Sequence, residues 1–483
     1  MTDADAVVVG AGPNGLAAAV TLARSGLRVH VFERNATIGG GARTEELTLQ
    51  GFRHDVCSAV HPMALASRFF REFQLARRVE LRQPPVSFGH PLDGGRAGIA
   101  YLDLDRTAEG LGRDGPAYRR LMAPLVARAD GVADFTGSNL LGLPADPVAA
   151  AWFALRSLEQ GSPLWNTRFA DDVVPAMLTG VAAHTILPMP GLAPAGAGLA
   201  LGAYAHARGW PIPVGGSQAI VDALADDLRA HGGTITTDAE ITDLDELPPA
   251  RAVLLDVAPR ALIGMAGERM PRRYARALKR FRYGNGVAKV DFALAGPVPW
   301  SNAELHSAGT AHVGGSRAEI ARAERDVAQG RHSTSPYVLA SQPSIVHDSR
   351  APAGRHVLWT YTHVPRGSAV DQREAVTRQI ERFAPGFRDL ILAASSRTAL
   401  DVERYDPNYV LGDIAAGAPS LRQLLRRPVI SIDPWRTPLR GVYLASSSTP
   451  PGPGVTGLNG WYAALSALRH EFGTRALPNL AFD

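Results

Sequence analysis

The residues with the clearest chemical potential lie near the N-terminus, where Gly10 to Gly15 follow the spacing Gly-x-Gly-x-x-Gly. Gly10 allows a tight turn, Gly12 lets a pyrophosphate approach the backbone, and Gly15 permits close packing of a helix on a strand. The first turn of that helix would offer free N–H groups to the phosphates. Glu33, 18 residues after Gly15, stands where a carboxylate can accept hydrogen bonds from a ribose diol. The pattern predicts a dinucleotide site.

Two short apolar runs and one helix must position these residues. Ala6–Val9 is apolar and rich in valine, which predicts a buried parallel strand. Residues 16–24 predict a helix that stops at Gly26. Val29–Phe32 predicts a second strand, which ends at Glu33. Since strand, glycine turn, helix, strand and acid all occur in order, a tight turn in an unrelated α/β unit explains the pattern poorly.

A second glycine-rich loop favours FAD over NAD as the dinucleotide. Residues 38–43 read Ile-Gly-Gly-Gly-Ala-Arg and follow Glu33 closely. Glycines there would bring the backbone against a ligand, and Arg43 would offer a cation to the pyrophosphate. NAD-binding domains do not usually carry this loop. A mobile glycine loop without a ligand is the alternative interpretation.

The segment near the C-terminus is also built for a polar ligand. Residues 441–445 predict a buried strand, residues 446–457 form a loop of Ser, Thr, Pro and Gly, and residues 460–470 predict a helix. No charged residue occurs between positions 441 and 468. A loop that leads into a helix N-terminus suits the polar edge of a flavin ring. An ordinary strand–loop–helix connection is the alternative, and the N-terminal motif favours the flavin.

These blocks, together with residues 51–62 and the Pro-Val-Gly-Gly sequence at 213–216, resemble the phytoene desaturase-like flavoprotein family. That family includes carotenoid desaturases and isomerases and retinol saturases. The resemblance implies an α/β fold, with a glutathione-reductase-type FAD-binding Rossmann domain built from discontinuous segments and an α+β substrate domain. The expected FAD-binding domain comprises residues 1–62, 213–261 and 401–483, and the expected substrate-binding domain comprises residues 63–212 and 262–400.

The resemblance also implies which residues contact the cofactor. Ile241 would touch the adenine through its backbone. Residues 243–249 shorten a hairpin that the family usually carries, which weakens the transfer of a carotenoid substrate to this chain. The full expected set is Gly10, Gly12, Pro13, Asn14, Gly15, Glu33, Arg34, Gly40, Gly41, Ala42, Arg43, Ile241, Ser448, Gly454 and Val455.

The expected reaction is removal of hydride from a hydrophobic small molecule to flavin N5, because the cofactor carries the redox chemistry in this class. No acid or base stands out in the sequence. His61 is a candidate, although a hydrogen-bonded structural role is the favoured interpretation for both His61 and His184. The alternatives are a redox-neutral isomerase or a saturase that uses reduced FAD, an amine oxidase with Trp461 and Tyr462 facing the flavin, and a flavin-bearing interaction protein without turnover.

Composition narrows the remaining possibilities. The chain has 46% hydrophobic and 20% charged residues and a net charge of +4, as expected for a globular cytoplasmic enzyme. Its one cysteine, Cys57, excludes an intramolecular disulfide and a Cys-rich metal site, and no His-Glu-x-x-His motif occurs, so no metal is expected. We expect no dedicated NAD(P)H domain. The flavin would then exchange electrons with O₂, a quinone or a carrier protein.

Two further features concern the substrate and the surface. Residues 135–154 and 173–207 are almost free of charge, which fits an ordinary helical core or the lining of a tunnel for an apolar substrate. Residues 271–282 are strongly basic, which fits a solvated helix face or peripheral contact with an anionic membrane. No nucleic-acid-binding module accompanies them. Lys289, in an alternating run at 287–294, is expected at a sheet edge or in an ion pair, and the oligomeric state stays open.

Overall fold

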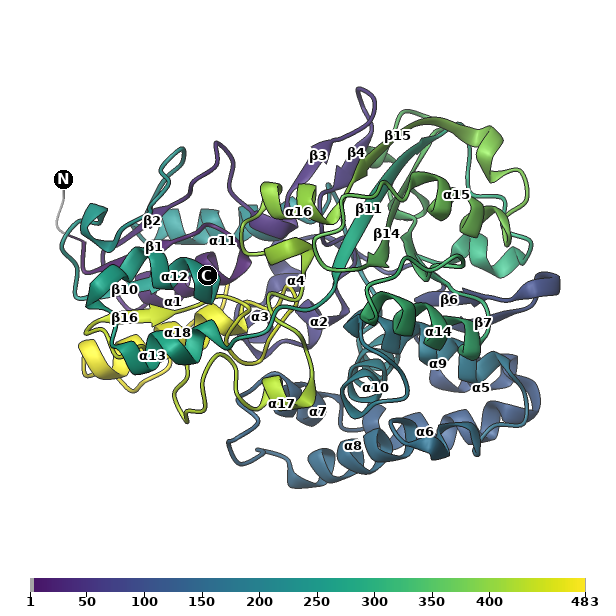
Figure 1. Cartoon of the computed structure of the whole chain (residues 1–483), viewed down its shortest axis with the longest axis horizontal. Helices are drawn as coiled ribbons and strands as arrows, with labels where there is room; N and C mark the ends of the chain where they lie inside the picture. The colour runs from purple at the N-terminus through teal and green to yellow at the C-terminus, as the bar shows by residue number, and fades with distance from the viewer. Residues whose placement is uncertain (1–3, 483) are drawn as a thin grey trace.

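The computed structural model describes residues 4–482, whose two large sheets lie at opposite ends of the molecule (Figure 1). The first sheet has the strand order β16-β10-β1-β2-β9 and is parallel throughout. Its strands are β1 (Ala6–Val9), β2 (Val29–Phe32), β9 (Thr234–Thr236), β10 (Ala252–Leu255) and β16 (Val442–Leu444). The inner strand β1 and its neighbour β10 are apolar on both faces because helices cover the sheet, as is usual for parallel sheets, whereas the edge strand β9 is Thr-Ile-Thr and more exposed.

Helices α1 and α18 pack closely against each other beside this sheet, and α11 also contacts α1 (Figure 1). The α1–α18 contact depends on Gly460, because a Cβ there would lie 1.8 Å from the carbonyl oxygen of Asn14. Within α1, a Cβ on Gly15 would lie 1.9 Å from the carbonyl oxygen of Gly10. The helices of this part are α1 (Pro13–Ala23), α11 (Gln218–Ala230), α12 (Pro259–Ala266), α13 (Arg272–Lys279) and α18 (Leu458–Glu471).

The second sheet is mixed, with the order β15-β11-β14-β13-β12-β6-β7. Only the β12–β6 pair is parallel among the strands described in it. Its strands are β6 (Phe88–Pro91), β7 (Ala97–Ala100), β11 (Gly286–Leu294), β12 (Thr310–Val313), β13 (Val338–Ser341), β14 (His356–Val364) and β15 (Ile391–Arg397). The nearby helices are α14 (Arg317–Ala328), α15 (Arg373–Glu381) and α16 (Ala399–Tyr405).

A helical layer covers the lower side of the molecule in Figure 1. It comprises α5 (Leu104–Gly110), α6 (Gly115–Val126), α7 (Ala129–Thr136), α8 (Pro147–Gln160), α9 (Val173–Ala182), α10 (Leu192–Ala207) and the short α17 (Leu421–Leu424). Short elements complete the fold: α2 (Pro62–Ala66), α3 (Arg68–Glu72), α4 (Leu75–Arg78), and the paired strands β3 (Thr44–Glu46) with β4 (Arg53–Asp55) and β5 (Leu81–Arg82) with β8 (Ile212–Pro213).

The expected α/β fold class is confirmed, with small shifts at element ends. The first helix begins at Pro13 rather than at residue 16, because proline is well suited to the first turn of a helix. The last helix begins at Leu458, two residues earlier than expected. The uncharged stretch 173–207 divides into α9 and α10. Among residues 4–482, none of the helices is both long enough and apolar enough to span a membrane.

Candidate functional site

A cavity of about 1070 Å³ lies at the carboxyl ends of the first sheet's strands and extends into the helical layer. Val9, Phe32, Asp256 and Ser446 line it where β1, β2, β10 and β16 have just ended. Parallel α/β sheets bind their ligands at this edge. Of the expected cofactor residues, the cavity is lined by Gly10, Gly12, Pro13, Asn14, Glu33, Arg34, Gly40, Gly41, Arg43, Ile241, Gly454 and Val455.

Three expected residues do not belong to the cavity lining. Gly15 packs against the Gly10 carbonyl, and Ala42 is fully buried in the core beside α1. The Ser448 hydroxyl donates a hydrogen bond to the carbonyl oxygen of Ala416 at 2.9 Å, while its neighbours Ser446 and Ser447 line the cavity. These three residues support the loops that form the cavity wall.

Glu33 and Arg43 form the polar end of the cavity. The Glu33 carboxylate accepts hydrogen bonds from the N–H groups of Ala11 at 2.9 Å and Asn35 at 3.0 Å. The Arg43 guanidinium donates to the carbonyl oxygen of Thr37 at 2.7 Å and lies 3.5 Å from Glu33 Oε1. Because both side chains are buried and held by the backbone, their positions are set without a ligand.

Two buried polar atoms at this end have no hydrogen-bond partner within residues 4–482. They are Arg43 Nε and Asn14 Oδ1. Buried polar atoms are normally paired, so unpaired ones indicate a group that the protein is built to receive. Next to them lie the backbone N–H group of Asn14 in the first turn of α1 and that of Gly12, a residue with no side chain to keep a phosphate away. This donor set fits the diphosphate and ribose of a dinucleotide.

Two acidic residues that the sequence analysis missed flank the glycine turn. Asp256 Oδ2 accepts a hydrogen bond from the Gly15 N–H at 3.0 Å, and Asp406 lines the same part of the cavity. Burial raises the pKa of Asp256 to about 8, and the nearby Asp406 and Glu33 add to this effect. Burial raises the pKa of Asp406 as well. Asp256 could have been noticed, because it follows the apolar run Ala252–Leu255 just as Glu33 follows Val29–Phe32.

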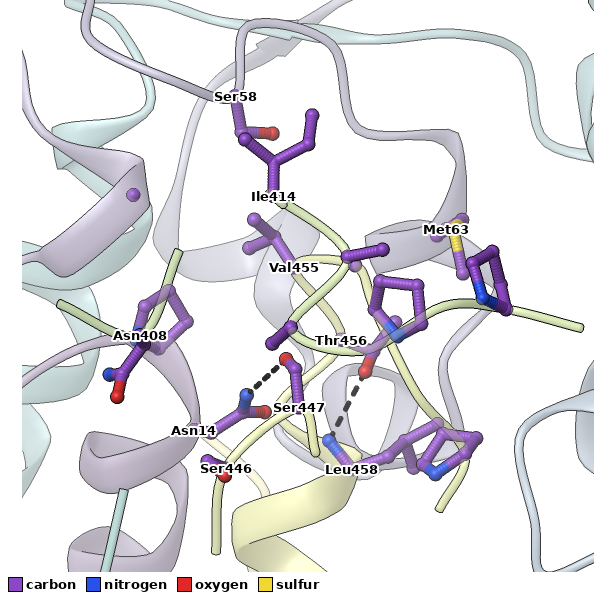
Figure 2. A pocket seen from close by; sticks show the side chains of 18 of the residues that line it. Asn14, Ser58, Met63, Asn408, Ile414, Ser446, Ser447, Val455, Thr456 and Leu458 are labelled. Carbon is purple, nitrogen blue, oxygen red and sulfur yellow. Dashed lines mark hydrogen bonds between the residues drawn. The ribbon is translucent and has the colours of Figure 1, made fainter. Parts of the chain in front are cut away.

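The C-terminal segment lines the cavity beside Asn14, with Ser446, Ser447, Val455 and Thr456 in its wall (Figure 2). Asn14 Nδ2 donates to Ser447 Oγ at 3.1 Å, which joins the start of α1 to this segment. Positions 452, 454 and 457 repeat the spacing Gly-x-Gly-x-x-Gly directly before α18, and all three glycines have positive φ. The glycine spacing therefore occurs twice, and its second copy belongs to the wall of the same cavity.

His61 is held by a buried hydrogen-bond network. Its Nε2 lies 2.8 Å from Ser217 Oγ, and the Ser217 N–H donates to Asp55 Oδ1 at 2.8 Å. Asp55 also forms a buried ion pair with Arg350 at 2.5 Å. The network ties residues 55–61 to the turn after β8. Burial lowers the pKa of His61 to about 4, so the imidazole is neutral at pH 7. The histidine lines the cavity and also has the structural role considered from sequence.

A second histidine lies farther along the cavity wall. His184 Nε2 lies 3.0 Å from Nε2 of His312, a residue of β12 that the sequence analysis did not single out. Burial lowers the pKa of His184 to about 3 and that of His312 well below its usual range. Two neutral rings at this distance share a single N–H proton between the facing nitrogens. The pair offers one exchangeable proton beside the cavity.

The far end of the cavity is apolar and uncharged. The stretches 135–154 and 173–207 supply much of it, which agrees with the tunnel interpretation. The residues from α8 and α10 are Phe153, Ala154, Ser157, Leu158, Leu192, Ala193, Gly196, Ala197, Ala200, Leu201 and Tyr204. The acids of the lining, Glu33, Glu240, Asp256 and Asp406, all come from the nucleotide end.

The expected aromatic pair does not face this cavity. Trp461 is buried on α18, with its ring centroid 6.3 Å from that of Phe69, and Tyr462 packs against the same core. The cavity wall instead contains Trp210, Trp359, Tyr361 and Tyr409. Lys289 is buried in an ion pair with Asp291 and lies behind the cavity wall, as one of the two arrangements expected for it.

Comparisons with known proteins agree with this arrangement. Residues 8–73 match the family described as NAD(P)-binding Rossmann-like domain. The chain is 26% identical to the rat (Rattus norvegicus) pyridine nucleotide-disulfide oxidoreductase domain-containing protein 2, an alignment that covers 95% of this chain and 92% of the rat protein. Over 55% of its length it is 27% identical to an uncharacterized protein of Mycobacterium tuberculosis, of which it covers 56%.

Solved structures share the fold over almost the whole chain. Putrescine oxidase bound to putrescine has a TM-score of 0.58 at 17% identity, with 97% of this chain and 99% of that chain covered. Cyclohexylamine oxidase from Brevibacterium oxydans has a TM-score of 0.55 at 17% identity, with 98% and 100% covered. The chain therefore shares its fold with these solved structures, and its first 73 residues include the Rossmann-type nucleotide-binding unit.

Proposed function

We propose that this protein is an FAD-dependent oxidoreductase that removes hydride from a hydrophobic small molecule. One observation supports this most strongly: a single cavity joins a dinucleotide cradle to an uncharged apolar tunnel. The cradle would receive the diphosphate at the start of α1 and the ribose at Glu33. The flavin ring would then extend toward the C-terminal segment, and the substrate would lie beyond it between α8 and α10.

The residues of the cavity wall have different proposed roles, which follow from their chemistry. When bound, FAD supplies a hydride acceptor at N5 of its ring. The apolar side chains of α8 and α10 exclude water and hold the substrate, and the His184–His312 pair can hold or move one proton at the cavity wall. The neutral His61 supports the loop before α2. We propose the cavity-lining members of the expected set as the residues that contact FAD.

The finer assignments follow from the sequence resemblance. We place the protein in the phytoene desaturase-like group, with FAD-binding segments 1–62, 213–261 and 401–483 and substrate-binding segments 63–212 and 262–400. O₂, a quinone or a carrier protein serves as electron acceptor, and the protein works in the cytoplasm with peripheral membrane contact. An amine oxidase is less well supported, because the apolar end lacks a lining carboxylate to pair with a substrate ammonium group.

The first test is the absorbance spectrum of the purified full chain, before and after acid precipitation. Flavin bands that pass into the supernatant would support bound, non-covalent FAD. A colourless protein that stays colourless with added FAD would overturn the proposal. Anaerobic bleaching by apolar compounds would then identify the substrate class, and isomerisation or saturation that requires reduced flavin would favour those alternatives.

The Ala197→Trp variant tests the tunnel separately. The added ring would fill the space between α8 and α10, far from the nucleotide end. It should slow flavin reduction by long apolar substrates by roughly tenfold or more, because a substrate displaced from its reactive position loses at least this factor in rate. Reduction by dithionite should not change. Equal loss with both reductants would contradict the assignment of the tunnel.

A further inference from the structure

We propose that the surface beside α17 docks on an anionic lipid bilayer. The surface is a groove of about 1690 Å³ between α13 and residues 420–440, and we call it the basic groove. In Figure 1, α13, α17 and α8 all lie along the lower edge of the molecule. Docking on the bilayer does not depend on the proposed redox activity. A role of docking in the entry of substrate into the cavity does rest on the proposed function.

The basic groove carries a strong uncompensated positive charge. Its exposed cations are Arg273, Lys279, Arg280, Arg282, Arg422, Arg426, Arg436, Arg440 and Arg469. None of these nine forms an ion pair with another residue in the described range 4–482, whereas exposed arginines such as Arg269 and Arg388 do. The sole carboxylate in the groove's described lining, Asp433, is engaged by Ser466 and His470. Such a surface attracts an anionic partner.

Aliphatic side chains project from the rim of the same groove. Ile430 is 67% exposed and Ile432 is 90% exposed, and both line the groove. An isoleucine this exposed costs hydration free energy in a protein surrounded by water, so a pair of them indicates an apolar contact. Cations around protruding aliphatic side chains match the chemistry of a bilayer interface, where headgroups are anionic and acyl chains lie just below.

The mouth of the substrate cavity adjoins the basic groove. Leu421, the first residue of α17, and Leu425, the residue that follows its end, line the cavity and are 42% and 36% exposed. Arg422 and Arg426, one position later in each case, line the groove. Successive residues of a helical turn point about 100° apart, so residues 421–426 turn their leucines to the cavity and their arginines to the groove. Leu158, on α8, also lines the cavity and is 55% exposed.

Other occupants fit these observations less well. A second copy of the chain would bring two basic grooves together, and like charges would repel. A nucleic acid would use the cations but not the isoleucines, and the aromatic residues of the groove, Tyr274 and Phe281, are not exposed for stacking on bases. An acidic protein would also leave the isoleucines unexplained. A bilayer uses both features and places the cavity mouth where apolar substrates dissolve.

The test measures co-sedimentation of the full chain with phosphatidylcholine vesicles, with and without phosphatidylserine, at low and high salt. We expect binding only to the vesicles that contain phosphatidylserine, and weaker binding in high salt. The Arg422→Glu/Arg426→Glu and Ile430→Ser/Ile432→Ser variants should each lose binding by on the order of tenfold or more. Arg53→Glu and Val370→Ser are matched controls, since both positions are exposed and neither lines the groove or the cavity.

Thermal unfolding confirms that each variant is folded. The proposal is overturned if the parent protein does not bind vesicles that contain phosphatidylserine, or if the control variants lose as much binding as the groove variants. Binding of a nucleic acid or an acidic protein without vesicle binding would overturn it too, as would a dimer that Ile430→Ser/Ile432→Ser converts to monomer. A protein that binds vesicles but no flavin would refute the proposed function and leave the docking surface intact.

Discussion

Replacing Gly12 with alanine should separate FAD binding from folding. A Cβ at Gly12 would lie 3.2 Å from Asp256 Oδ2 and 3.9 Å from Gly40 Cα, and its φ of −76° suits any residue. The methyl group therefore needs only a small shift of the Asp256 side chain. We expect the free energy of unfolding of the apoprotein to change by less than about 1 kcal/mol.

FAD binding should respond far more strongly to the same change. The methyl group would occupy the space through which the diphosphate reaches the N–H groups of α1. Loss of one hydrogen bond to a charged group costs about 1.5–3 kcal/mol, which corresponds to a roughly 10- to 100-fold increase in the Kd for FAD. Titration of the apoprotein with FAD, followed by flavin fluorescence, measures this constant, and urea unfolding measures the stability.

Two other glycines provide controls with opposite outcomes. Gly15→Ala would place a Cβ 1.9 Å from the Gly10 carbonyl oxygen, so it should destabilise the fold by about 3 kcal/mol. Gly110→Ala, in α5, meets no atom within 4 Å and should change neither property. The reasoning is refuted if Gly12→Ala binds FAD as tightly as the parent protein, or if it unfolds as easily as Gly15→Ala.

Three further predictions concern buried ionisable groups. Because the pKa of Asp256 is raised to about 8, the folded apoprotein retains a proton that the unfolded chain has lost between about pH 4 and pH 8. The free energy of unfolding should therefore fall as the pH rises through this range. Urea unfolding should show a flatter pH dependence for Asp256→Asn, and an unchanged pH dependence would contradict the assignment. Asp55→Ala leaves Arg350 buried without its carboxylate and should cost about 3–5 kcal/mol in the same assay, whereas a loss near zero would show that the pair contributes little. Burial raises the pKa of Cys57 to about 11, so its alkylation by iodoacetamide at pH 8 should be roughly 100-fold slower than in the unfolded chain, and equal rates would show an exposed thiolate.

The dinucleotide end was predictable because its signals are local. The glycines at 10–15, the flanking strands and Glu33 lie within one short stretch of chain, and their effects act through backbone conformation and burial. The second strand, β2, has the bounds expected for it, and the first helix begins three residues and ends one residue earlier than expected. The acid at the end of β10 acts at the same place but belongs to a strand more than 200 residues away, so its role emerges only when β10 pairs with β1.

The apolar end shows the opposite case. The absence of charge from residues 173–207 could not distinguish a packed core from a tunnel, because both require apolar side chains. Packing decided it: α10 turns one face to the helical layer and another to the cavity. Trp461 illustrates the same limit, since a helical residue's direction depends on its neighbours and α18 turns this ring into the core.

The sequence by itself determined that the chain builds a Rossmann-type nucleotide-binding unit, since glycine spacing and strand patterning act over a few turns of chain. Only the tertiary structure decided which side chains line the cavity. It brought His184 to His312 and set Leu421 and Leu425 beside the arginines of the basic groove. These contacts join segments that are far apart in sequence, or they depend on side-chain directions that packing alone selects. No local sequence pattern encodes them.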